Sequence, residues 1–226
     1  MRTNFASFAM IVIAGVSGST LAHEGDIGLK IESGRLVTGI VDASGSSEVV
    51  VPGQRVFAGE FGLIAPGYSD EPGFFAAAGE FSAGSRIGFD VLKAVRSWNG
   101  SDFSELSSSR ITLEYAAGAF SVTSPVADGV VPGFSFPVGA SGGFDEHLDL
   151  YLSPDSTGIY LLEVQLWTTE SGVSGTDPIW LVLNNGADEV MHEDAISWVE
   201  ANLVPAPGVL GLMAVGAALA SRRRRN

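Results

Sequence analysis

Cysteine is absent from the 226 residues, and basic side chains are scarce, with 12 lysines and arginines against 26 aspartates and glutamates. Without cysteine the chain can form no disulfide, no thiol nucleophile and no Cys-type zinc site. A stable fold must therefore depend on its apolar core, or on a metal held by oxygen and nitrogen ligands. Histidine is also rare, because only three copies occur.

The first 22 residues have the pattern of an export signal. Arg2 gives a positive start, residues 5–16 form an apolar core, and Thr20-Leu21-Ala22 ends it as a small-x-small cleavage site. We expect signal peptidase to cut after Ala22, so that His23 becomes the first residue of an exported protein. A buried N-terminal helix is the alternative interpretation.

The last stretch, residues 204–226, has the pattern of a sorting or anchoring segment. Pro205 and Pro207 lack backbone donors and separate it from the chain before it. The apolar run that follows, residues 209–220, is shorter than the roughly 20 residues that usually span a bilayer. The segment ends in a basic cluster, which favours the cytoplasmic side: Arg222, Arg223, Arg224 and Arg225. An ordinary short tail anchor is one interpretation.

This order of two prolines, an apolar helix and an arginine cluster resembles the PEP-CTERM sorting signal of Gram-negative bacteria. Ala206 stands where family members usually carry glutamate. The resemblance implies processing near Pro205 and Pro207 by a membrane protease-transpeptidase of the exosortase type. It also implies transient anchoring in the inner membrane, and a destination at the cell surface, at the outer membrane or in the extracellular matrix.

Between the two signals, residues 23–203 are long enough for a single domain with its own core. All 26 acidic residues lie in this part, whereas five of the 12 basic residues lie in the signals. Seven basic side chains against 26 acidic ones give the domain a net charge of −19. Such a surface repels nucleic acid and attracts cations, so we expect no nucleic-acid partner.

Short alternating segments, separated by glycine and proline turns, predict a domain built mainly from strands. Residues 26–32 and 35–41 alternate on either side of Ser33-Gly34 and predict an opening hairpin. Asn99-Gly100 and Ala117-Gly118 predict further hairpins. Strands at this spacing favour an antiparallel β-sandwich of jelly-roll or immunoglobulin-like type.

One segment, residues 188–203, has helical spacing instead. Asp188 and Glu189 lie in its first turn, where carboxylates favour the helix dipole. Its apolar side would comprise Val190 or Met191, Ala195, Trp198 or Val199, and Leu203. We predict that this single helix ends the domain.

The sequence lacks the common signatures of catalytic sites. It contains no P-loop and no dinucleotide-binding glycine pattern before a helix. Its one Gly-x-Ser-x-Gly match, at residues 139–143, lies in a stretch with loop character and not between a strand and a helix, as the catalytic motif requires. Carboxylate pairs are numerous, but in so acidic a chain they are usually a solvated surface rather than a glycosidase pair. We therefore predict that the protein is not an enzyme.

All three histidines have acidic neighbours. On a strand, Asp145, His147 and Asp149 would share one face, and on a helix Asp188, Glu189 and His192 would do so. Imidazole and carboxylate bind zinc and related ions where thiols are absent. An exposed acidic surface without metal is the alternative. The candidate metal ligands are His23, Asp26, Asp145, His147, Asp149, Glu189 and His192.

Longer stretches at residues 23–39, 70–74, 84–103, 145–166 and 181–186 resemble a family of PEP-CTERM surface proteins. Some members of that family are described as repressed by a zinc-responsive regulator. The second half is also distantly similar to actinobacterial surface-anchored repeats that carry His-x-His before a turn. Here the corresponding residues are Glu146-His147-Leu148-Asp149. The resemblance implies an extracytoplasmic role in zinc handling.

The leading hypothesis is an exported, surface-associated binding protein for zinc or another divalent metal. The alternative is a structural or carbohydrate-binding component of the extracellular matrix, with an aromatic platform formed by Trp98, Tyr68, Phe74 and Phe75. The expected partners are signal peptidase, an exosortase-like enzyme, the membrane through the C-terminal tail, and a divalent metal or a glycan.

Overall fold

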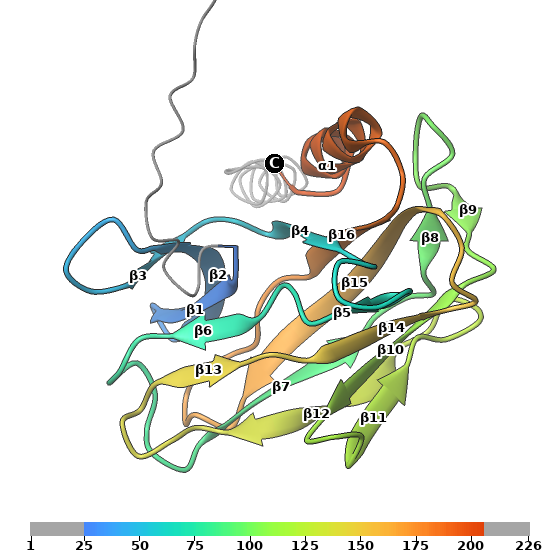
Figure 1. Ribbon diagram of the computed structural model, residues 1–226. Coiled ribbons are helices and arrows are strands. Elements are labelled where there is room, and N and C mark those ends of the chain that lie inside the picture. The colour runs from blue at the N-terminus through green and yellow to red at the C-terminus, as the bar shows by residue number, and fades with distance from the viewer. Residues whose placement is uncertain (1–24, 206–226) are drawn as a thin grey trace, which may run out of the picture.

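The computed structural model describes residues 25–205, which form three sheets and one helix (Figure 1). This architecture confirms the all-β prediction at the level of fold class. The predicted signal peptide (residues 1–22), His23 and the tail residues from 206 to 226 lie outside the described residues. No helix within the described part is both long and apolar enough to cross a membrane.

The first sheet contains the opening hairpin and has the strand order β13-β6-β1-β2-β3. Ser33 and Gly34 form the predicted hairpin turn, and their φ values are 51° and 76°. The strands are β1 (Ile27–Glu32), β2 (Arg35–Asp42), β3 (Val49–Pro52), β6 (Phe74–Ala76) and β13 (Phe144–Glu146).

The second sheet lies between the main core and the helix, in the order β12-β7-β15-β16-β4. A short hairpin, β8 (Arg96–Ser97) with β9 (Glu105–Leu106), extends it beside β15. The main strands are β4 (Val56–Glu60), β7 (Arg86–Val91), β12 (Val131–Pro137), β15 (Gly158–Thr168) and β16 (Ile179–Asn185).

The third sheet has the order β11-β10-β14-β5. Its strands are β5 (Tyr68–Ser69), β10 (Arg110–Tyr115), β11 (Phe120–Thr123) and β14 (Asp149–Ser153). Strand β13 ends at Glu146 and β14 begins at Asp149, so the chain changes sheets at His147 and Leu148. The expectation of one continuous strand through His147 is therefore wrong.

Strand β16 is buried along its whole length because both of its faces are covered. Leu181 and Leu183 pack into the large core between the sheets, whereas Trp180 and Val182 belong to a second apolar cluster that includes the helix. A strand covered on both faces is apolar at successive positions rather than alternating. Burying each such side chain contributes about 1.5–3 kcal/mol.

Helix α1 (Glu189–Asn202) has the predicted extent. Asp188 is its N-cap, and its Oδ1 accepts a hydrogen bond of 3.0 Å from the Val190 amide, which satisfies one of the free donors at the helix start. The buried positions are His192, Ala195 and Val199. The apolar side therefore begins with His192, and the prediction of Val190 or Met191 at that position is wrong, because both are exposed.

Two strand pairs are parallel, which the prediction of an antiparallel sandwich did not include. Strand β1 pairs with β6, so that Ile27 lies opposite Phe74. Strand β4 pairs with β16, so that Glu60 lies opposite Asn184. Each parallel pair brings together segments that are far apart in the sequence.

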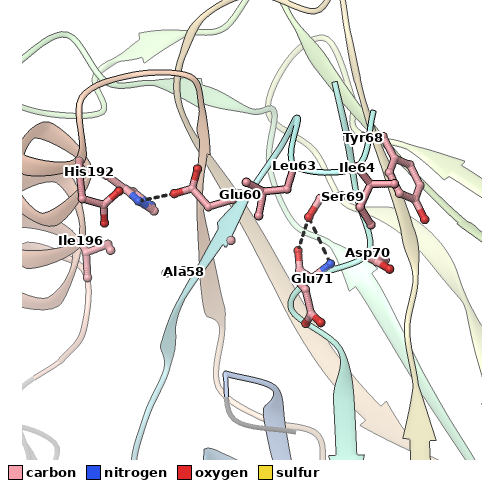
Figure 2. Close-up of a pocket in the computed structure, with 12 residues that line it drawn as sticks. Ala58, Glu60, Leu63, Ile64, Tyr68, Ser69, Asp70, Glu71, His192 and Ile196 are labelled. Atoms are coloured by element: carbon pink, nitrogen blue, oxygen red, sulfur yellow. Dashed lines mark hydrogen bonds and ion pairs between the residues drawn. The ribbon is translucent and has the colours of Figure 1, made fainter. Parts of the chain in front are cut away.

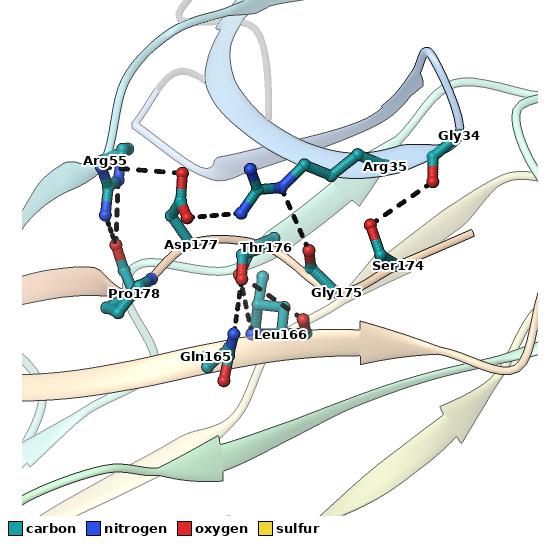
Figure 3. Close-up of polar contacts among 10 residues, drawn as sticks. All are labelled: Gly34, Arg35, Arg55, Gln165, Leu166, Ser174, Gly175, Thr176, Asp177 and Pro178. Atoms are coloured by element: carbon teal, nitrogen blue, oxygen red, sulfur yellow. Dashed lines mark hydrogen bonds and ion pairs between the residues drawn. The ribbon is translucent and has the colours of Figure 1, made fainter. Parts of the chain in front are cut away.

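A polar strap ties the opening hairpin to the segment before β16 (Figure 3). Asp177 forms ion pairs with Arg35 of β2 and with Arg55, which precedes β4. Arg55 also donates to the Pro178 carbonyl and lies over the Trp180 ring at 5.0 Å. Burial lowers the pKa of Arg55, but this guanidinium stays charged at neutral pH. We assign the strap a structural role, because its charges are paired with each other.

Candidate metal centres

Three strand ends bring together the first candidate centre, which we call the Asp26 centre. Asp26 immediately precedes β1, and Gly73 immediately precedes β6, so the parallel pairing puts them side by side. Strand β13 runs antiparallel to β6 on its other side, and His147 follows its last residue. The ligand atoms of Asp26, Glu71 and His147 consequently lie within 4.8 Å of one another.

His147 is held by one ring nitrogen and presents the other to carboxylates. Its Nδ1 lies 3.0 Å from the Asp70 carbonyl oxygen, and because a carbonyl only accepts, this nitrogen carries the hydrogen. Its Nε2 then faces Asp26 Oδ2 at 3.9 Å and Asp145 Oδ1 at 4.0 Å. Metal-binding histidines are held in the same way, by a hydrogen bond from the nitrogen that does not bind the ion.

The carboxylates of the Asp26 centre carry more negative charge than His147 can compensate. Asp26 is 2% exposed, and its Oδ1 accepts a 3.0 Å hydrogen bond from the Gly73 amide. Burial, together with the nearby Asp26, raises the pKa of Glu71, although His147 opposes the shift. Closely spaced carboxylates in a partly buried site favour a bound proton or a bound cation.

Gly73 leaves the space in which the ligands meet. A side-chain carbon at this position would lie 2.6 Å from His147 Cε1 and 2.8 Å from Asp26 Oδ1, which is closer than such atoms can approach. The ring and the carboxylate can therefore approach each other only because residue 73 has no side chain.

The second candidate centre lies where helix α1 meets β4, and we call it the Glu60 centre. Glu60 is the last residue of β4, and Glu189 is the first residue of the helix. His192 follows one turn later on the buried side. The ligand atoms of Glu60, Glu189 and His192 also lie within 4.8 Å of one another.

His192 presents the opposite ring nitrogen from His147. Its Nε2 lies 3.0 Å from the Val182 carbonyl oxygen of β16 and must donate to it. Its Nδ1 lies 3.1 Å from Glu60 Oε1, yet this buried atom makes no hydrogen bond of acceptable geometry. The side chain is 3% exposed, so water offers little compensation.

A cavity of about 410 Å³ separates the helix from the segment that carries Glu71 (Figure 2). Glu60 points toward His192 on the helix side, whereas Asp70 and Glu71 lie on the opposite side. Apolar side chains complete the wall, and no lysine or arginine contributes to it. The apolar part comprises Ala58, Leu63, Ile64 and Ile196.

The structure brings together some of the predicted ligands and separates others. Asp26, Asp145 and His147 converge, and Glu189 lies with His192 in a different centre. Asp149 instead accepts a 2.8 Å hydrogen bond from the Tyr68 hydroxyl and belongs to neither set. His147 and His192 therefore lie in different centres, and His23 lies outside the described residues.

Two ligands were missed by the sequence analysis. Glu71 belongs to the Asp-Glu-Pro-Gly-Phe stretch, whose glycine and adjacent carboxylates could have suggested a site. Glu60 had no local signal, because its position depends on the parallel pairing of β4 with β16.

Comparisons with protein-family models, with curated proteins and with solved structures found no match.

Proposed function

We propose that this protein binds a divalent metal ion, with zinc as the leading candidate, at the Asp26 centre. The observation that carries the proposal is the geometry of His147, whose Nδ1 is fixed by the Asp70 carbonyl while Nε2 faces the buried Asp26. Neutral imidazole and carboxylate oxygens form a common zinc ligand set, and they also suit related first-row ions.

The distances fit an ion after a small closure of the side chains. Zinc bonds of about 2.0–2.1 Å at tetrahedral angles separate two ligand atoms by roughly 3.3–3.4 Å. His147 Nε2 and Asp26 Oδ2 are 3.9 Å apart, so one side chain would move by about half an ångström. Exposed Asp145 lies 4.0 Å from the same ring nitrogen and can add a third ligand. Exposed Glu71 lies 3.7 Å from the other ring nitrogen, so its side chain would have to turn toward Nε2 to bind the ion.

Zinc titration by calorimetry tests this function. We expect saturable binding to the purified protein, and replacing His147 with alanine or Glu71 with glutamine should weaken it by at least about 10–100-fold. Glu193→Gln is a matched control, because Glu193 is an exposed carboxylate of α1 outside both centres. Equal affinity in the parent and in His147→Ala would exclude the Asp26 centre as the binding site.

The remaining predictions about the cell belong to the same proposal. We infer an exported, surface-associated protein that is processed by signal peptidase and by an exosortase-like enzyme, and that is not an enzyme itself. The predictions of export and processing rest on the sequence patterns of residues 1–22 and 204–226. We also propose that the domain belongs to the jelly-roll or immunoglobulin-like sandwiches, a proposal supported by the three sheets that share one apolar core.

Carbohydrate or matrix binding remains the alternative, but its aromatic platform has less support. Phe74 and Phe75 are buried at 4% and 9% exposure, and Trp98 packs against Phe103 and Trp198 in the helix cluster. Tyr68 is partly exposed and contacts the ring of Tyr151 at 5.3 Å. Binding of the protein to a glycan array would revive this alternative.

A further inference from the structure

We propose that the Glu60 centre is a second divalent-cation site, separate from the Asp26 centre, with Glu60, Glu189 and His192 as its protein ligands. This site does not depend on the first one, because the two ligand sets share no residue. It would join helix α1 to strand β4 through the ion.

The buried nitrogen of His192 is the strongest observation for this site. Nδ1 has no hydrogen-bond partner, although a carboxylate oxygen lies only 3.1 Å from it. Two acceptor atoms facing each other repel unless a positive group lies between them. A proton on Nδ1 would serve only if the N–H pointed at Glu60, and the ring is not oriented for that hydrogen bond.

The separation of 3.1 Å between His192 Nδ1 and Glu60 Oε1 matches that of two ligand atoms bound to one ion. With bonds of about 2.0–2.1 Å, it corresponds to an angle of about 95–102° at the ion, near the tetrahedral value. Glu189 supplies a third ligand from the first turn of α1. The charges also agree, because two carboxylates and a neutral imidazole leave two negative charges for a divalent cation to neutralise.

The neighbouring cavity gives the ion access to solvent. Glu60, Glu189 and His192 all line the cavity of about 410 Å³, so an ion held by three protein ligands would have its open position on that side. A site with three protein ligands and one open position binds water or a small ligand there. The ion would therefore remain exchangeable although His192 is buried.

The ring-nitrogen assignment makes the site directly testable. In the Glu60 centre the ion must bind Nδ1, because Nε2 donates to Val182, whereas in the Asp26 centre it must bind Nε2, because Nδ1 donates to Asp70. NMR of the protein with ¹⁵N-labelled histidine distinguishes the two nitrogens. On zinc addition we expect a metal-bound Nδ1 signal for His192 and a metal-bound Nε2 signal for His147.

Variants identify the ligands without disturbing the buried ring. Glu189→Gln should weaken the His192 response at least about tenfold and leave the His147 response unchanged, because Glu189 is exposed and belongs to the Glu60 centre alone. Glu60→Gln should act in the same way. The control Glu193→Gln, one turn along the helix and exposed, should change neither response.

Each outcome decides between the two sites. A His147 response with an unchanged His192 would overturn the second site and leave the first intact. A His192 response that survives both glutamine variants would also overturn the proposed ligand set. If neither histidine responds at saturating zinc, both proposals fail. If the site is correct, zinc will also slow amide hydrogen exchange in α1, since the ion holds the helix against β4.

Discussion

Adding one methyl group at Gly73 should abolish metal binding at the Asp26 centre without removing any ligand. The new carbon of Gly73→Ala would lie 2.6 Å from His147 Cε1 and 2.8 Å from Asp26 Oδ1. Ordinary contacts between carbon atoms are about 3.5–4.0 Å, so the imidazole must retreat by roughly 1 Å. The backbone itself tolerates alanine, because φ at Gly73 is not positive.

A displacement of that size exceeds what a metal site accepts. Ligand distances in a working site lie within about 0.2 Å of their ideal values, so an ion could no longer contact Asp26 and His147 together. We expect a loss of zinc affinity of at least about 10–100-fold. Crowding the site should also cost about 1–3 kcal/mol of unfolding free energy.

Calorimetric titration and thermal unfolding of the same samples measure both effects. Gly129→Ala is the matched control, since nothing lies within 4 Å of a carbon added at Gly129, and it should bind zinc like the parent. A Gly73→Ala protein that folds and binds zinc with the parental affinity would refute the assignment of the ion to this space.

Three further predictions concern pH, a hydrogen bond and the core. Burial lowers the pKa of His147, but the Asp70 carbonyl and the nearby carboxylates outweigh this effect and raise the pKa above 6.5. Because a proton competes with zinc for the imidazole, zinc affinity measured against pH should begin to fall while the pH is still above 6.5. The hydrogen bond to Asp149 raises the pKa of Tyr68, so this bond stabilises the fold fully below about pH 10 and progressively less as the pH rises above 10. Tyr68→Phe should therefore cost about 1–2 kcal/mol in urea unfolding at pH 7 and less above pH 10. Leu162→Ala, at a position with 0% exposure, should cost about 2–5 kcal/mol in the same assay without weakening zinc binding at the candidate centres.

The elements predicted well are those whose signals are local. The Ser33-Gly34 turn between two alternating segments fixed the opening hairpin, and Asp188 before a 3.6-residue pattern predicted the start of α1. The burial of His192 was missed because a pattern of apolar residues counts histidine as polar. Its hydrogen bond to the Val182 carbonyl offsets the cost of burying the ring, and this bond forms only where α1 packs against β16.

The candidate sites were predicted only where the ligands are near one another in sequence. Asp145 and His147 do lie together, but Asp149 does not, because the chain leaves one sheet and enters another at Leu148. Glu71 reaches Asp26 through the parallel pairing of β1 with β6, across more than 40 residues. Side-chain periodicity describes one strand at a time and contains no information about such pairings.

X-ray diffraction from zinc-soaked crystals, collected at the zinc absorption edge, tests the central claim most directly. The account predicts an anomalous peak about 2.0–2.1 Å from His147 Nε2, with a bond to Asp26, and a second peak at the same distance from His192 Nδ1. Peaks confined to other surface carboxylates, with both imidazoles free, would contradict it.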